Sequence, residues 1–337
     1  MFLYFLGKYF EGGENKMIKE NFMNYKNKTN KEKNKVIFTC FMFVFVLFII
    51  ANITGTAQDN LFPITLIDDS GFKIVINEKP ERIISAAPSN TEIIYTLNLE
   101  DKLVGRSDFC NYPDETKDIE SIGKMSPLNL EKIISLNPDL VLSYGGFQLK
   151  DIPRLRDLGI NVLVIRSDTI QEMIQGIGLI AHACGIPEKG EELISQINER
   201  INWISFQVMA SSRQKPKVFV GSNFDSIWSP GNGTLFHELI TLAGGENILG
   251  NQQGWVSISP ELVAEREPDI ILVPTGIMNP EEISKIKKDI MSHPGWSNIP
   301  AIKNNQIFAV NEDLFYRAGP RLVDGLELLY EIFSGKK

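Results

Sequence analysis

The stretch NLEKIISLNPDLVL (residues 129–142) returns 130 residues later as SPELVAEREPDIIL (residues 259–272). Each copy has an N-cap residue, a short helix, a Pro-Asp break and a buried apolar strand. The same register pairs Glu131 with Glu261 and Met125 with Trp255. The repeat predicts two similarly built lobes that face each other across a cleft. The alternative is chance similarity between two common helix–strand units.

Short apolar strands alternate with helices around both copies. The predicted strands are 82–87, 104–107, 140–143, 162–165, 218–221, 270–273 and 307–310, and the predicted helices are 128–136, 150–158, 234–243, 260–266 and 281–290. A hairpin is predicted at 64–67 and 73–76. The spacing of Ser89 and Glu92 predicts a capping box for the helix after the first of these strands. This alternation is typical of α/β folds with parallel sheets covered on both faces.

A long helical pattern at residues 188–212 separates the two halves. It carries one apolar stripe, formed by Leu193, Ile194, Ile197, Ile201, Ile204 and Val208. We interpret this helix as a stiff connection between an N-terminal α/β lobe, residues 58–187, and a C-terminal α/β lobe, residues 213–337. The alternative is an ordinary surface helix of a single domain.

The N-terminal segment differs in charge from the rest of the chain. The 337 residues hold 34 Lys and Arg against 42 Asp and Glu, a net charge of −8. Residues 1–35 hold eight Lys and four Glu, a net +4, so the other 302 residues carry −12. An uncharged apolar stretch follows Lys35 and ends in Gly55-Thr56-Ala57.

This pattern predicts that residues 1–57 are either a signal peptide cleaved after Ala57 or an uncleaved membrane anchor. We therefore expect the remainder to work outside the cytoplasmic membrane, in a periplasm or at a cell surface, with the membrane touched only by this segment. Met1, Met17 and Met23 are all candidate start residues.

Composition excludes several classes of protein. With 43% hydrophobic and 23% charged residues the chain is globular rather than disordered. Its acidic body offers no electrostatic footprint for nucleic acid, and one apolar stretch cannot build a polytopic membrane protein.

Cys110 and Cys184 are interpreted as free thiols, with a disulfide as the alternative.

Sequence motifs for catalysis are missing. The sequence contains neither a phosphate-binding glycine loop nor a Gly-x-Ser-x-Gly elbow. Its three histidines, His182, His237 and His293, are scattered without metal-ligand spacing. We therefore expect a binding protein without metal or cofactor, and an exported enzyme remains a remote alternative.

Several side chains in predicted loops are candidates for ligand contact. Loops at the carboxyl ends of parallel strands bind ligands in α/β proteins, and aromatic rings there offer flat apolar area. The apolar candidates are Phe109, Met125, Trp228 and Trp255. The polar candidates follow the last strand and are Asp313, Tyr316 and Arg317. The alternative is that each apolar side chain fills the core beneath its own loop.

The chain resembles the periplasmic binding proteins of ABC importers for cobalamin, haem and ferric siderophores. The resemblance covers about residues 80–333 and is clearest in RIISAAPSNTE, VGRSDFCNYP, NLEKIISLNPDLVLS, LRDLGINVLVI, GGENIL, SPELVAEREPDIIL and LFYRAGPRLVDGL. It is strongest to the cobalamin-binding members. The resemblance implies two Rossmann-like lobes joined by one long rigid helix, with the ligand in the cleft between them.

The resemblance also implies roles for single residues. Ligand contacts of the cobalamin-binding members fall on Phe109, Met125, Trp255, Asp313 and Arg317, with Trp228 in a segment that matches less closely. Glutamates that dock on permease arginines fall on Glu131 and Glu261, which also sit at equivalent places in the repeat. The sequence departs from that pattern where Phe109 and Met125 replace a Tyr and a Trp, and where Tyr316 replaces an acid.

These observations predict an extracytoplasmic receptor that delivers a corrinoid to an ABC importer. Its expected partners are the permease dimer and its ATPase subunits, and we expect the receptor to be a monomer. The alternative ligand is a ferric siderophore or haem. A siderophore chelate requires several basic residues in the cleft, whereas haem requires an axial ligand, for which Tyr112, Tyr144 and Tyr316 are candidates.

Overall fold

The computed structural model describes residues 61–221 and 227–336, together with Glu20, Met23, Lys35 and Met42. The predicted signal peptide or anchor lies almost wholly outside the described residues. The chain divides into two compact units at Asn60/Leu61, and the fold below is that of the second unit. Within the described ranges, no helix has both the length and the apolar character that a membrane span requires.

The first lobe is built on a four-stranded parallel sheet with strand order β4-β3-β5-β6. Its strands are β3 (Ile83–Ser85), β4 (Leu103–Arg106), β5 (Leu140–Tyr144) and β6 (Val162–Ile165). Its short helices are α3 (Pro88–Thr96), α4 (Leu130–Ser135) and α5 (Ile152–Asp157). The antiparallel hairpin β1 (Ile64–Ile67) and β2 (Lys73–Ile76) has the predicted bounds.

The second lobe repeats this plan with a parallel sheet of order β12-β11-β7-β9. Its strands are β7 (Lys217–Val220), β9 (Glu246–Asn247), β11 (Ile270–Thr275) and β12 (Ile307–Asn311). A separate antiparallel pair consists of β8 (Ile227–Pro230) and β10 (Trp255–Ile258). The helices are α8 (Leu235–Leu242), α9 (Pro260–Arg266), α10 (Pro280–Met291), α11 (Pro300–Lys303), α12 (Asp313–Tyr316) and α13 (Leu322–Phe333).

The sequence repeat corresponds to a structural repeat, as predicted. The Asn129 side chain accepts a hydrogen bond from a backbone N–H of α4, and Ser259 caps α9 in the same way. After each helix the Pro-Asp break places an aspartate directly before the next strand, at the amino-terminal edge of the parallel sheet. Asp139 accepts from the N–H of Arg82, just before β3, and Asp269 accepts from the N–H of Lys217 in β7, both at 2.9 Å. The same contact therefore recurs inside each lobe.

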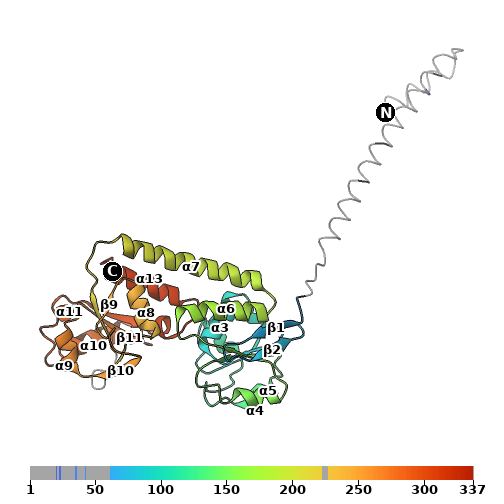
Figure 1. Cartoon of the computed structure of the whole chain (residues 1–337), viewed down its shortest axis with the longest axis horizontal. Coiled ribbons are helices and arrows are strands. Elements are labelled where there is room, and N and C mark those ends of the chain that lie inside the picture. The colour runs from blue at the N-terminus through green and yellow to red at the C-terminus, as the bar shows by residue number, and fades with distance from the viewer. Residues whose placement is uncertain are drawn as a thin grey trace, which may run out of the picture. The chain divides into compact units, whose positions relative to one another are not determined.

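One long helix, α7 (Pro187–Ala210), connects the lobes. Its 24 residues extend about 36 Å at 1.5 Å per residue. It packs against α6 (Ile170–Ala183) of the first lobe and against α13 and α8 of the second (Figure 1). Ile197 and Ile204 of the predicted stripe are buried in these contacts. Helix α6 is not among the helices predicted from the sequence, although it is apolar and 14 residues long.

One apolar core crosses from lobe to lobe. It includes Met173 and Ile177 of α6, Ile204 of α7, and Leu326 and Leu329 of α13, all fully or almost fully buried. Apolar burial of this kind is the main stabilising term in folding. The lobes are thus joined by packed helices as well as by the chain connection.

The predicted capping box at the start of α3 is wrong. The helix begins at Pro88, its N-cap residue is Ala87, and no side chain caps it. Ser89 and Glu92 consequently lie inside the helix, two residues later than a capping box requires. The Glu92 side chain is buried, with 3% of its surface exposed, and it faces the second lobe instead of its own helix end.

Candidate ligand-binding site

A cavity of about 860 Å³ is lined by residues of both lobes. Its first-lobe wall comes from the four segments that follow β3, β4, β5 and β6, which all leave the sheet at the carboxyl ends of parallel strands. Its second-lobe wall comes from the segment after β12, the start of α8 and the start of β10. Carboxyl ends of parallel strands are the usual ligand edge of α/β sheets.

Six of the seven predicted ligand residues line this cavity. They are Phe109, Met125, Trp255, Asp313, Tyr316 and Arg317. Large rings remain accessible there: Phe109 is 55% exposed, and Trp255 and Tyr316 are exposed to similar degrees. The Trp255 and Tyr316 rings contact each other at a centroid distance of 5.6 Å. An exposed aromatic wall of this kind fits a large, flat, partly apolar ligand.

Trp228, the seventh predicted residue, does not line the cavity. It lies on β8 opposite Ser257 of β10, and its side chain is 57% exposed. Trp255 lies two positions along the same ribbon, opposite Pro230. Because side chains two positions apart share a face of a strand, both indoles lie on the same face of the β8–β10 pair. The structure therefore places Trp228 beside the aromatic wall but outside the cavity.

The first-lobe wall carries a polar cluster that the sequence analysis missed in part. The Tyr144 hydroxyl donates to Asp168 at 2.6 Å, and Arg166 pairs with Asp168 and Glu172 at 3.4 Å each. Burial, and then the hydrogen bond to Asp168, raises the pKa of the Tyr144 phenol above its ordinary value. The signal for this cluster is its position at the carboxyl ends of the apolar strands β5 and β6, the same rule that singles out Phe109 after β4.

Two of the three charged side chains on the second-lobe wall, Asp313 and Arg317, form an ion pair. Arg317 pairs with Asp313 at 2.7 Å and donates to the side-chain oxygen of Asn111, in the first lobe, at 2.6 Å. Burial, and then the negative charge of Glu312, raises the pKa of the Tyr316 phenol. Both phenols of the cavity are thus neutral hydrogen-bonding groups near neutral pH.

The two glutamates predicted for permease docking lie away from the cavity. Glu131 is exposed in the first turn of α4, and Glu261 is exposed in the first turn of α9. The backbone N–H at Glu261 and the Ser259 hydroxyl lower the pKa of the Glu261 carboxyl. A carboxylate at a helix start is also favoured by the helix dipole. The two acids therefore occupy equivalent, solvent-facing places on the two lobes.

The remaining candidates for metal or redox chemistry are not assembled into a centre. Among the described residues, no group of His, Cys, Asp and Glu is arranged to hold a metal ion. Cys110 and Cys184 are both free and both buried. Tyr112, named as a possible axial ligand for haem, lies under the guanidinium of Arg321, whose Cζ is 3.5 Å from the ring centroid.

Comparison with known proteins identifies the class. The family model for periplasmic binding proteins matches residues 83–314. The ABC transporter substrate-binding lipoprotein YvrC of Bacillus subtilis (strain 168) is 34% identical over 280 residues, which cover 81% of this chain and 86% of YvrC. The chain therefore belongs to the periplasmic binding protein family. Proteins of this class capture solutes for ABC importers outside the cytoplasmic membrane and are not enzymes.

Solved structures agree with this assignment. The periplasmic vitamin B12 binding protein BtuF of Vibrio cholerae superposes with a TM-score of 0.64 at 28% identity, covering 76% of this chain and 97% of BtuF. The periplasmic heme-binding protein RhuT of Roseiflexus sp. RS-1 gives 0.67 at 26% identity, covering 76% and 99%. The two-lobe α/β architecture is common to all three. The resemblance noted in the sequence is thereby confirmed at the level of the family.

Proposed function

We propose that the protein captures a corrinoid, cobalamin, outside the cytoplasmic membrane and delivers it to the permease of an ABC importer. The observation that carries the proposal is the charge balance of the cavity. Its described lining holds four carboxylates, Asp168, Glu172, Glu312 and Asp313, against two guanidinium groups, Arg166 and Arg317. Both guanidinium groups are already paired with carboxylates of the same wall.

Such a wall suits a large ligand whose rim carries amides. Amides donate to carboxylates and accept from guanidinium groups, so they use both kinds of group present. The edge of the corrin ring bears amide side chains, and its faces are apolar enough to lie against Phe109 and Trp255. The volume of about 860 Å³ is near the upper end of the roughly 300–1,000 Å³ typical of small-molecule sites.

Haem or a ferric siderophore is the second candidate ligand, since RhuT is a heme-binding protein. The two propionates of haem, or an anionic chelate, would meet a wall with more carboxylates than cations. Like charges brought together in a partly desolvated site repel each other. Tyr144 and Tyr316 lie in the cavity and are the available candidates for an axial oxygen ligand.

Titration of the protein, purified after expression of the full chain, with cyanocobalamin, haem and a ferric siderophore tests the proposal. We expect submicromolar binding of cyanocobalamin by isothermal titration calorimetry, with much weaker binding of the other two. Tight binding of haem or the siderophore in place of the corrinoid would assign the second candidate. Absence of submicromolar corrinoid binding contradicts the proposal.

Other parts of the proposal concern the assembly. Glu131 and Glu261 would dock on basic residues of the permease, one lobe on each half of a two-fold partner. The ATPase subunits would complete the importer. The N-terminal segment would export the protein or tether it to the membrane, and the receptor would act as a monomer.

A further inference from the structure

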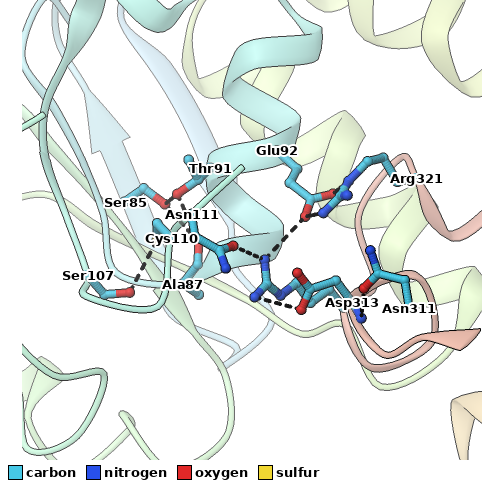
Figure 2. Close-up of polar contacts among 11 residues, drawn as sticks. Ser85, Ala87, Thr91, Glu92, Ser107, Cys110, Asn111, Asn311, Asp313 and Arg321 are labelled. Atoms are coloured by element: carbon cyan, nitrogen blue, oxygen red, sulfur yellow. Dashed lines mark hydrogen bonds and ion pairs between the residues drawn. The ribbon is translucent and has the colours of Figure 1, made fainter. Parts of the chain in front are cut away.

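The carboxylate of Glu92 joins the two lobes through an ion pair with Arg321 (Figure 2). Glu92 comes from α3 of the first lobe, and Figure 2 shows it pointing at Arg321 of the second lobe. Arg321 donates from Nε to Oε2 at 3.0 Å and from Nη2 to Oε1 at 2.6 Å. This is a bidentate pair, the strongest geometry available to an arginine and a carboxylate.

A second arginine shares the same carboxylate. Nη1 of Arg317 lies 3.8 Å from Oε1 of Glu92. Arg317 lines the cavity, whereas Glu92 does not. The Arg317 guanidinium is also held by Asn111 at 2.6 Å and by Asp313 at 2.7 Å. Two first-lobe side chains, Asn111 through a hydrogen bond and Glu92 through its charge, therefore act on a second-lobe residue that lines the cavity.

The arrangement requires the negative charge of Glu92. The side chains of Arg317 and Arg321 are both only 16% exposed, and Glu92 is 3% exposed. Two guanidinium groups this close repel each other, and the repulsion grows where water is excluded. Removal of one partner from a buried ion pair leaves an uncompensated charge, which is more costly than loss of the attraction alone.

Neighbouring contacts leave little freedom for the cluster. The Arg321 guanidinium lies on the Tyr112 ring, which follows Asn111 in the same first-lobe loop. A Cβ added at Gly319 would lie 3.0 Å from Oε2 of Glu92, so the chain between the two arginines passes close to the carboxylate. A glycine is the residue that allows this close approach.

We infer that Glu92 is a positioning residue for ligand binding, whose carboxylate holds Arg317 and Arg321 so that the Arg317 guanidinium is aimed at the ligand. This inference rests on the proposed function, because it takes Arg317 as a ligand contact. Glu92 would affect ligand affinity by holding Arg317 in place, without contacting the ligand itself. A purely structural tie between the lobes would instead affect stability without acting through Arg317.

A double-mutant cycle separates these two roles. The variants are Glu92→Gln, which removes the charge at nearly constant size, Arg317→Ala, and the two combined. Glu327→Gln is the matched control, because Glu327 also forms a bidentate pair with an arginine, Arg200, on helices that do not line the cavity. Affinity for cyanocobalamin and the unfolding temperature are measured for each protein.

We expect Glu92→Gln to weaken cyanocobalamin binding about tenfold. We expect the double variant to bind like Arg317→Ala alone, within about twofold, because Glu92 acts through Arg317. Glu327→Gln should bind like the original protein even where its unfolding temperature falls.

Unchanged affinity in Glu92→Gln, or additive losses in the double variant, would overturn the inference. If Glu92→Gln does not fold, Glu92→Asp, which keeps the charge but shortens the reach, replaces it in the same cycle.

Hydrogen–deuterium exchange of the ligand-free protein tests the role of Glu92 whichever ligand the protein binds. In the ligand-free protein, we expect hydrogen–deuterium exchange of the amides in residues 313–321 to rise in Glu92→Gln and not in Glu327→Gln. Equal exchange in the two variants contradicts the inference whatever the ligand is. If the original protein fails to bind cyanocobalamin, the proposed function fails, and the cycle is run with the haem or siderophore that it does bind.

Discussion

The indole of Trp255 and the phenol ring of Tyr316 pack edge to face, with centroids 5.6 Å apart and planes inclined at 66°. Trp255 begins β10 and Tyr316 ends α12, so two segments distant in sequence build one aromatic wall. Tyr316 also contacts Phe236 of α8 at a centroid distance of 5.8 Å. Because it is packed on both sides, the wall is a preformed surface for a flat ligand.

Replacement of Trp255 by alanine should weaken cyanocobalamin binding by roughly 10- to 100-fold, the loss typical of a central aromatic anchor. Trp228→Ala is the matched control, because Trp228 is the same residue type on the same face of the β8–β10 pair but lies outside the cavity. We expect the control to change affinity by less than about threefold. Calorimetric titration gives both values. Equal losses in the two variants would show that the ligand extends along the ribbon beyond the cavity.

Alanine at both Glu131 and Glu261 should leave ligand affinity unchanged while weakening delivery to the permease. Both carboxylates are exposed on equivalent helix starts and neither lines the cavity. Transport into vesicles that contain the importer, or ligand-dependent ATPase activity, reports the delivery step. Glu281→Ala is a suitable control, because Glu281 is also an exposed acid in the first turn of a helix but has no partner in the repeat. Loss of cyanocobalamin binding in the double variant would place these acids in the ligand site instead.

Local patterns were sufficient to predict most of the fold. Strand β6 and helix α9 have their predicted bounds, and the repeat of Asn129 and Ser259 as N-caps is confirmed. These features depend on short-range periodicity and capping, which a sequence displays directly. Helix α6 was missed, although Thr169 caps it. Its buried residues Ile170, Met173, Ile177 and Ile180 follow the helical spacing of three and four, so the sequence does carry the signal for this helix.

The candidate site could be predicted only in part, because the contacts that hold Arg317 come from segments distant in sequence. Phe109 and Trp255 stand out in a sequence as large rings in predicted loops, although Trp255 begins strand β10 in the structure. Glu92 does not: its spacing from Ser89 also matches a capping box, and only the tertiary structure shows that it pairs with Arg321, 229 positions away. Local spacing cannot distinguish an acid that caps a helix from one that compensates buried arginines.

The pair between Arg200 of α7 and Glu327 of α13 should make a small, pH-dependent contribution to stability. Arg200 donates to both carboxylate oxygens of Glu327, and this hydrogen bonding lowers the pKa of the Glu327 carboxyl. A lowered pKa stabilises the folded state above the ordinary pKa of Glu, and this stability is lost as pH falls through the lowered value. Since both side chains are more than a third exposed, the contribution is about 1 kcal/mol or less.

Urea unfolding of Glu327→Gln tests this contribution. The variant should be less stable than the original protein at pH 7 by about 1 kcal/mol or less, and the difference should shrink below about pH 4. A difference that grows as the solution is acidified would contradict the assigned sign.

Cys110 and Cys184 should resist thiol reagents while the protein is folded. Each is 1% exposed, and burial raises the pKa of both thiols, that of Cys184 to about 12. Because the thiolate is the reactive form, both burial and pKa slow the reaction. Alkylation at about pH 8, followed by mass spectrometry of the two peptides, should show little modification in the native protein and full modification in urea. Peptides that stay unmodified in urea until a reductant is added would reveal a disulfide.

The phenol of Tyr316 should remain protonated when tyrosines of ordinary pKa ionise. Burial and then the charge of Glu312 raise its pKa above the ordinary value near 10. A phenolate ligand for iron requires the opposite shift, so this environment favours hydrogen bonding to a ligand amide over iron ligation. The near-ultraviolet absorbance change between pH 7 and about pH 10.5 should therefore be the same in Tyr316→Phe as in the original protein, because Tyr316 contributes nothing to it. A smaller change in the variant would mean that Tyr316 ionises readily, and it would favour haem over the corrinoid as the ligand of this cavity.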